Sequence, residues 1–185
     1  MINRNFFFSQ VRLRPFGGSL SQSQVNGLTA ILDEWELKYA KKDDRWLAYM
    51  LATAHHETDK TMKPIREYGR GAGRSYGTAD PQTKQVYYGR GFVQLTWRNN
   101  YQKMSTVVKD DLVTNADLAL RPDYASEIMF YGMINGSFTG KKLGDYFSTA
   151  KEDWVNARRI INGTDKANQI ADYGKQYYAA ISYTK

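Results

Sequence analysis

The segment RWLAYMLATAHHETDK, residues 45–60, has the apolar spacing of a helix that buries one side. At about 100° per residue, one face carries Trp46, Leu47, Met50, Leu51 and Ala54. Glu57 falls on that same face with Thr58, whereas His56 points away from it and His55 sits on its flank. Burial disfavours a charged carboxylate. Glu57 is therefore either a carboxylic acid that holds and donates a proton, or a solvated residue beyond a helix that frays before it.

The rest of the chain predicts one mainly helical domain over residues 1–185, with a small extended or hairpin element. No repeat, linker or low-complexity tract divides the chain, and its length suffices for one sizeable core. Capping residues and apolar spacing define the other expected helices. The first follows the Ser21/Gln24 capping box, and the central helix is capped by Asp43 or Asp44. A third is capped by Asn99 or Asn100 and buries Tyr101, Met104 and Val108, and a fourth runs from Pro122 to Asn135 and is closed by Gly136. A short helix is expected over 154–161, and a last one carries the apolar stripe Ile170, Tyr173, Tyr177 and Ile181.

Composition narrows the class of partner. The chain has 26 basic and 19 acidic residues, a formal net charge of +7. The basic residues occur in scattered pairs and form no long block, which favours general attraction to a polyanion, such as nucleic acid or an anionic cell wall. No transmembrane run is present, and Phe6–Phe8 is too short for a signal-peptide core. We therefore expect a protein made in a cytoplasm.

A metal or cofactor site is not expected. The sequence has no cysteine, and its only histidines are His55 and His56. Adjacent residues of a helix diverge by about 100°, so these two side chains cannot bind one ion together. The spacing of a zinc protease motif is also missing.

The stretch YYGRGFVQLTW, residues 87–97, is the second candidate for a binding site. Alternation predicts a short extended segment in which Gln94 and Thr96 form a polar row, with Trp97 on the opposite face. Glycines around Arg90 allow close approach of a ligand to the backbone, and Tyr88 begins the motif. The alternative is a glycine-rich turn into a strand with solvated polar residues. The pattern matches neither a P-loop nor a dinucleotide fingerprint.

Glu57 and Glu67 form a possible pair of catalytic carboxylates. Glu67 begins a long loop rich in Gly and Arg, EYGRGAGRSYGTADP at residues 67–81, and a loop of this length is often functional. Arg66 and Arg70 are its neighbours in sequence. One buried and one solvated carboxylate across a cleft would separate acid and base roles.

Three motifs in this order resemble one enzyme family. HET at 56–58, YYGRGFVQLTW at 87–97 and ARRIING at 157–163 look like the family-19 chitinase-like glycoside hydrolases. The similarity is greater to the phage endolysin branch of that lysozyme superfamily, which residues 16–20 and 132–143 also resemble. It covers nearly the whole chain, with YGRG-x-x-QLT as its most specific motif. The resemblance implies a lysozyme-like fold, mainly α.

The resemblance also implies residue roles. Glu57 would be the general acid and Glu67 the general base, with Asp59 and Asp80 as alternative bases. Thr96 would help to hold the attacking water. The remaining matches would bind the sugar chain: Gln94, Asn100, Asn162, Tyr88 and Arg90. The disulfide cysteines of the plant chitinases are missing.

The function implied is hydrolysis of the glycan of bacterial peptidoglycan, with inversion at the sugar carbon. Without a signal peptide, such an enzyme would be made in the host bacterial cytoplasm and act on the wall in the periplasm. A separate membrane-permeabilising protein, a holin, would then give it access, and we expect a monomer that does not insert into membranes. Three alternatives remain: a chitinase acting on N-acetylglucosamine polymers, a catalytically silent wall-binding or virion module, and a nucleic-acid binder. The last is disfavoured because no helix or ribbon clusters basic side chains.

Overall fold

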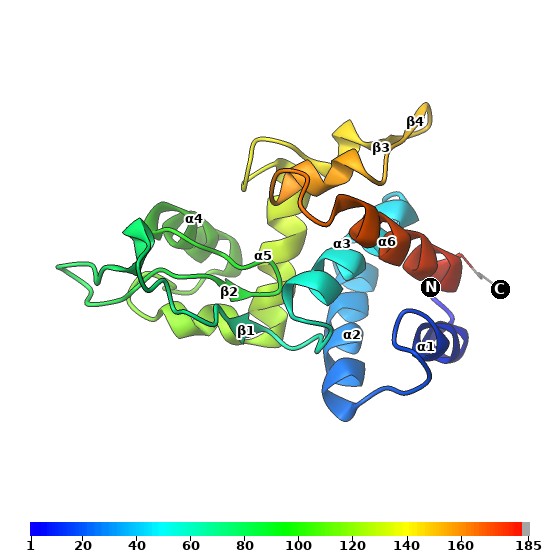
Figure 1. Ribbon diagram of the computed structural model, residues 1–185, viewed down its shortest axis with the longest axis horizontal. Helices are drawn as coiled ribbons and strands as arrows, with labels where there is room; N and C mark the ends of the chain where they lie inside the picture. Colours follow the sequence, from blue (N-terminus) through cyan, green and yellow to red (C-terminus); the bar gives the residue numbers. More distant parts are fainter. Residues whose placement is uncertain (183–185) are drawn as a thin grey trace.

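The computed structural model describes residues 1–182, which form six α-helices and two short antiparallel sheets (Figure 1). The α-helices are α1 (Arg4–Leu13), α2 (Gln22–Glu34), α3 (Asp44–Glu57), α4 (Arg98–Val108), α5 (Pro122–Asn135) and α6 (Ala167–Ile181). The strands are β1 (Ile65–Arg66), β2 (Arg90–Gly91), β3 (Phe147–Ser148) and β4 (Lys151–Glu152). Short helical turns are η1 (Trp35–Tyr39), η2 (Ser75–Gly77), η3 (Ala116–Leu120), η4 (Leu143–Asp145) and η5 (Asn156–Ile160). The expected mainly helical architecture is confirmed.

Helix α3 is the centre of the molecule, as the apolar spacing predicts. Every residue from Leu47 to His55 is buried, so the helix is enclosed on all sides and not along one stripe only. His55 is therefore part of the core. The side chain of Asp43 accepts a hydrogen bond from the amide of Arg45 at 3.0 Å and caps the first turn. The helix runs to Glu57, which excludes fraying before that residue.

The helices around α3 begin and end largely where their capping residues predict. Ser21 and Gln24 form the full capping box at the start of α2. Pro122 occupies the first turn of α5, and Gly136 ends that helix with a left-handed φ of 69°. In the last helix, Ile170, Tyr177 and Ile181 are buried and Tyr173 is half-buried. The expected short helix at 154–161 is a 3-10 turn, η5.

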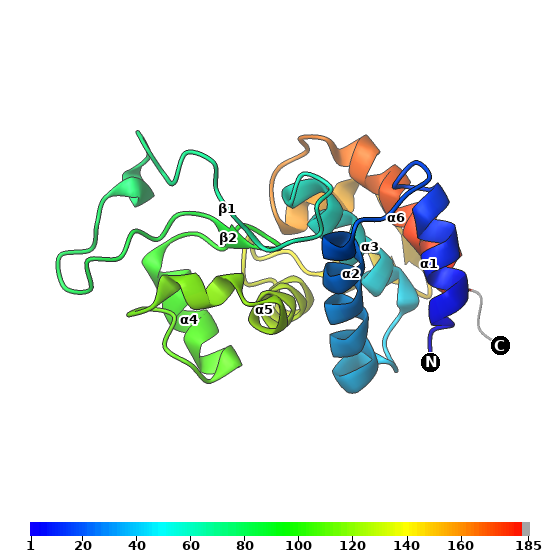
Figure 2. The ribbon, with the colours of Figure 1, turned by 90° about the horizontal axis from the view of Figure 1, so that it is seen from below.

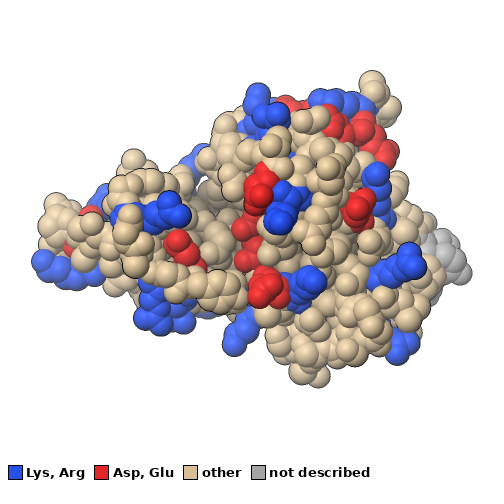
Figure 3. Space-filling model, in the orientation of Figure 1, with Lys and Arg blue, Asp and Glu red and all other residues tan. Residues whose placement is uncertain are grey.

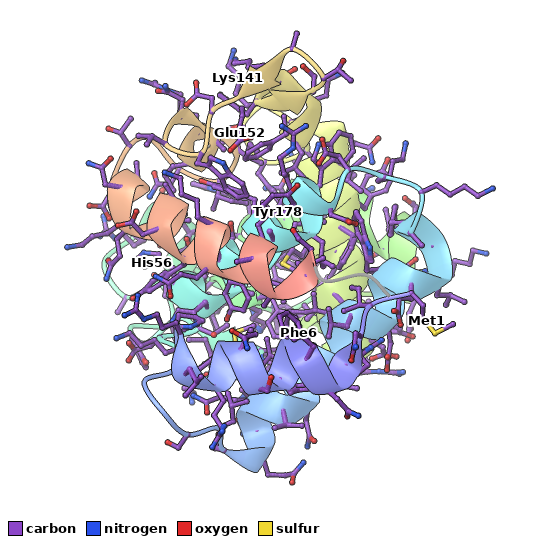
Figure 4. The ribbon with its side chains drawn as sticks, turned by 90° about the vertical axis from the view of Figure 1, so that its right-hand side faces the viewer. Met1, Phe6, His56, Lys141, Glu152 and Tyr178 are labelled. Carbon is purple, nitrogen blue, oxygen red and sulfur yellow. The ribbon has the colours of Figure 1, made fainter. Side chains whose placement is uncertain are left out.

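Helix α1 completes the packing on α6 and was not expected from the sequence. The two helices lie one above the other in Figure 4, and α6 also packs on α3. Phe7 of α1 is buried, with its ring centroid 6.4 Å from that of Tyr177. Phe7 and Phe8, two of the three phenylalanines near the N-terminus, therefore supply core contacts for a helix.

The chain forms two parts that meet along α5 (Figure 2). Helices α1, α2, α3 and α6 lie on one side, and α4, η3 and the β1–β2 hairpin lie on the other. Figure 3 shows the surface hollowed between the two parts, with acidic side chains along the hollow. Basic side chains lie on the outer edges of both parts.

The stretch from Tyr87 to Trp97 corrects a detailed expectation. Only Arg90–Gly91 is strand, and the chain then turns tightly back, so that the backbones of Arg90 and Leu95 exchange hydrogen bonds of 3.1 and 2.8 Å. The turn ends with Gln94 at a φ of 54°. A turn replaces the predicted alternation, because glycine at 91 adopts a left-handed φ of 87° that reverses the chain. Helix α4 then begins one turn earlier than expected, with Trp97 and not an asparagine at its N-cap.

No helix within residues 1–182 is both long and apolar enough to cross a membrane.

Candidate active site

Glu57 ends helix α3 in contact with an arginine from a distant part of the chain. The Nη1 atom of Arg158 donates a hydrogen bond to Glu57 Oε1 at 2.6 Å. The side chains of Arg158 and Glu57 are 3% and 16% exposed, so the ion pair is largely shielded from water. The Nε of Arg158 donates to the carbonyl of Asp165 at 3.1 Å, which fixes the guanidinium. Burial of Glu57 is thus accompanied by a cation, and apolar surroundings alone do not describe its environment.

Glu67 lies just after β1 and is held by neutral donors. Its Oε1 accepts a hydrogen bond from the hydroxyl of Tyr76 at 2.9 Å, and its Oε2 accepts one from the amide of Gly89 at 3.1 Å. Burial, followed by the hydrogen bond to Glu67, raises the pKa of Tyr76, so this hydroxyl keeps its proton and can donate. The neighbouring Arg66 instead pairs with Asp117 at 2.8 Å. The expectation that adjacent arginines surround Glu67 is therefore wrong for Arg66.

The backbone register places Glu67, Gly89 and Thr96 in one row. Arg66 pairs with Arg90, so the next antiparallel pair is Glu67 with Gly89, whose backbones are joined by a 2.7 Å hydrogen bond. The bridge between Arg90 and Leu95 likewise puts Gly89 opposite Thr96. A Cβ at position 89 would lie 2.7 Å from the Oε1 of Gln94, so any larger residue there would displace the Gln94 side chain. The candidate base and the candidate water-holding residue thus flank a glycine.

The two alternative bases have other surroundings. Asp80 accepts hydrogen bonds from the amides of Gln82 and Thr83 and lies 3.2 Å from Arg98 Nε. These contacts, with the Thr83 amide first, lower the pKa of Asp80. Its carboxylate closes a turn and has little freedom to activate a water. Asp59 is exposed, with a left-handed φ of 49°, and its one side-chain contact within residues 1–182 is the hydroxyl of Tyr68 at 3.4 Å.

Thr96, Gln94 and Asn100 form a connected polar group beside the row. The Thr96 hydroxyl donates to the carbonyl of Gln94 at 2.8 Å, which leaves its oxygen lone pairs as acceptors for a water. The Asn100 side chain donates to the carbonyl of Thr96 at 2.8 Å, so its amide oxygen stays available. The Gln94 side chain lies against Gly89, and all three residues are half-buried.

Arg90 and Tyr88 support the hairpin from behind. Arg90 is 3% exposed, and its guanidinium donates to Asp117, to the carbonyls of Val86 and Tyr88, and to the Tyr101 hydroxyl. It also stacks on the ring of Tyr88 at 3.7 Å, and Tyr88 itself is 7% exposed. Its Nε and Nη1 atoms are thus used to hold the hairpin, so Arg90 positions the Gly89 row, and its role in sugar binding stays a prediction.

Asn162 lies on the other side of the hollow, beside the arginine of Glu57. It is exposed, its backbone amide donates to the carbonyl of Arg158, and its side-chain oxygen accepts from the amide of Gly163. Its amide nitrogen has no partner within the described residues. Asn162 and Glu57 thus belong to the helical part, whereas Glu67 and Thr96 belong to the hairpin.

His55 and His56 do not form a metal site. His55 Nδ1 lies 3.0 Å from the Tyr177 hydroxyl in the core, while His56, labelled in Figure 4, is half-buried near one end of α6. In the part of the chain that the structure describes, no group of three potential ligands converges.

Sequence reasoning missed Tyr76 and underrated Arg158. Arg158 lies in the ARRIING motif, in which the resemblance implied a role only for Asn162. Nothing in the sequence sets Tyr76 apart from the other tyrosines. Its position two residues before Thr78 in a glycine-rich loop gives no periodic signal, so only the folded loop reveals its contact with Glu67.

Known proteins share this fold. Chitinase C from Streptomyces griseus superposes with a TM-score of 0.64 at 22% identity, covering 97% of this chain and 78% of the other. A bacterial family 19 chitinase gives a TM-score of 0.60 at 20% identity over 99% and 96% of the two chains. A family GH19 class IV chitinase from Zea mays gives 0.59 at 16% identity, over 95% and 90%. At these identities the likeness establishes the fold, the mainly-α lysozyme-like fold of family-19 chitinases.

Two plant endochitinases are similar in sequence to parts of this chain. An acidic endochitinase of Petunia hybrida is 35% identical over 131 residues, 69% of this chain and 47% of the relative. Acidic endochitinase Q of Nicotiana tabacum is 59% identical over 32 residues, 17% of this chain and 13% of the relative. The chain thus spans about half the length of the petunia relative and a smaller share of the tobacco relative. No model of a known protein family matches the chain.

In fold and in part of its sequence, the chain is therefore similar to family-19 chitinases.

Proposed function

We propose that this chain hydrolyses the glycan of bacterial peptidoglycan by an inverting mechanism with two carboxylates. The observation that carries the proposal is the contrast between Glu57, enclosed at the end of α3, and Glu67, held by neutral donors just after β1 in the other part of the molecule. Two carboxyl groups in different environments can take different roles in one reaction.

In this mechanism Glu57 donates its proton to the glycosidic oxygen as the bond to the leaving sugar breaks. The fixed guanidinium of Arg158 orients the carboxyl group through the 2.6 Å contact and stabilises the carboxylate that remains. The acid therefore has a partner ready for the charge that it develops.

Glu67 accepts a proton from the attacking water in the same mechanism. Tyr76 and Gly89 each occupy one of its oxygens, which sets the direction of the remaining lone pairs. Thr96, in the same backbone row, offers its hydroxyl oxygen to that water. Attack from the face opposite the leaving group inverts the sugar carbon.

Peptidoglycan is favoured as the substrate by charge. A protein of net charge +7, with basic side chains on the outer edges of both parts, is attracted to an anionic wall (Figure 3). Chitin is the second candidate, because the named relatives are chitinases. Chitin carries no net charge, so the two substrates differ in what the basic surface contributes.

The test is digestion of purified sacculi and of N-acetylglucosamine oligomers, with mass spectrometry and anomer analysis of the products. Release of glycan fragments from sacculi, at a rate that falls as salt rises, supports the proposal, since screening weakens surface attraction. Cleavage of the oligomers alone identifies a chitinase. Products of retained configuration would exclude direct attack by a water activated at Glu67.

A further inference from the structure

Trp97 occupies a backbone position that does not suit a tryptophan. Its φ of 75° and ψ of 135° lie in a region that bulky side chains rarely adopt. It is also the N-cap of α4, where Ser, Thr, Asp or Asn can hydrogen-bond the free amides and tryptophan cannot. Its amide donates to the Tyr87 carbonyl at 2.9 Å, and its carbonyl accepts from Asn100 at 3.0 Å, so the surrounding chain imposes this conformation.

The core does not require this side chain. Trp97 is 49% exposed, whereas Trp35 and Trp154 are 1% and 4% exposed. An exposed residue with an unfavourable backbone conformation, at an N-cap that it cannot satisfy, is typical of a functional position.

Trp97 faces a hollow that adjoins the candidate base. The hollow has a volume of about 280 Å³ and lies between the loop over residues 75–81 and the start of α4. Tyr76 forms its inner wall, with its ring centroid 5.3 Å from that of Trp97 and the rings edge to face. The hydroxyl of the same tyrosine donates to Glu67, so Tyr76 contacts both the hollow and the carboxylate.

Free polar groups accompany the aromatic surface. Ser75 and Thr78 also line the hollow, and within residues 1–182 neither hydroxyl has a hydrogen-bond partner. An indole face beside unpaired hydroxyls matches a sugar ring, which has an apolar C–H face and a rim of hydrogen-bonding groups.

We propose that this hollow is a subsite for an N-acetylhexosamine ring of the glycan chain, stacked on Trp97 next to the Glu67 side of the cleavage point. The inference rests on the proposed function, since it assigns a further part of the same substrate. Chains long enough to fill the hollow gain affinity from it, and disaccharides do not.

The decisive variant is Trp97→Asn, because asparagine removes the aromatic face and is a preferred residue at helix N-caps. The variant should unfold at a temperature about 2–4 °C higher, yet bind long chains more weakly. Binding is measured by calorimetry in a Glu57→Gln background, so that no hydrolysis occurs, with a disaccharide and a hexasaccharide of N-acetylglucosamine and with purified glycan strands. Loss of the stacking should weaken the hexasaccharide or the strand about tenfold and leave the disaccharide unchanged.

Two matched variants separate stacking from structure. Trp97→Phe keeps an aromatic face and should retain most of the affinity for long chains. Tyr178→Asn removes a 36% exposed aromatic from α6 and should not alter binding. Long ligands should also shift the tryptophan fluorescence of the parent but not of Trp97→Asn.

Equal affinity of the parent and Trp97→Asn for every long chain overturns the subsite. Failure of the parent to bind either the oligomers or the glycan strands overturns the proposed function, and the subsite with it.

Discussion

The two candidate carboxylates are the same residue type in opposite kinds of structure. Glu57 is held by a charged partner 101 positions away, so its environment exists only when η5 packs beside the end of α3. Glu67 is held by neutral donors 9 and 22 positions away, within a single loop and hairpin. The environment of Glu57 therefore depends on assembly of the whole helical part, whereas that of Glu67 depends on local backbone register.

Replacing Glu57 with glutamine should have the largest effect. The amide keeps the shape but has no acidic proton, so turnover of sacculi should fall by about 10²–10⁴-fold. A substrate with a good leaving group, which needs no proton, should retain part of its rate. The measurement is initial rate on both substrates, with circular dichroism to verify folding. Equal losses on the two substrates would contradict the acid role.

Glu67→Ala should fail on both substrates by a comparable factor, because the water is no longer activated. Added azide could occupy the vacated space and restore turnover as a glycosyl azide of inverted configuration. Asp59→Ala and Asp80→Ala are the matched controls and should stay active, Asp59→Ala without loss of stability. If Glu67→Ala is fully active and either Asp59→Ala or Asp80→Ala is inactive, the inactive variant identifies the general base.

Removing Arg158 should show how much the Glu57–Arg158 ion pair contributes to the free energy of unfolding. Arg158→Met leaves Glu57 largely buried without its cation, which should lower the free energy of unfolding by about 3 kcal/mol. In a Glu57→Gln background the same change should cost clearly less, because no charge is left uncompensated. Urea unfolding of the four proteins gives the coupling energy. Strict additivity would mean that the ion pair contributes nothing to the helical part.

The helical part should also be the more sensitive to acid. Burial lowers the pKa of His55 to about 4, below its ordinary value of 6.5, and its Nε2 has no partner within the described residues. The unfolded chain binds this proton first, so stability should fall as the pH drops from about 6.5 to about 4, by about 3 kcal/mol in total.

Unfolding of His55→Leu across this range provides the control. The variant should lose less stability than the parent between these pH values. An identical pH dependence of both proteins would assign the acid sensitivity to other groups, of which His56, with a pKa also lowered by burial, is the nearest.

The smallest effect should come from Tyr76→Phe on the hairpin side. The change removes one hydrogen bond from Glu67 while the Gly89 amide remains. We expect turnover to fall about tenfold, with the melting temperature nearly unchanged because the residue is only half-buried. A loss as large as that of Glu67→Ala would make Tyr76 itself a participant in the reaction.

The sequence by itself determined the helical frame and the end of α3. Apolar spacing and caps act over a few residues, so Ser21, Asp43, Pro122 and Gly136 marked helix boundaries that the structure confirms. The extent of α3 to Glu57 was equally legible, but its apolar stripe understated its burial, because every residue from Leu47 to His55 is buried.

Only the tertiary structure decided what surrounds each carboxylate. The pairing of Glu57 with Arg158 joins two segments that no local pattern links, and the contact of Tyr76 with Glu67 depends on how a glycine-rich loop folds back. Left-handed residues at Gly91, Gln94 and Trp97 turned an expected strand into a reversal. Periodicity records which side of an element is buried, whereas hydrogen bonds between distant segments depend on distances that only the packed chain sets.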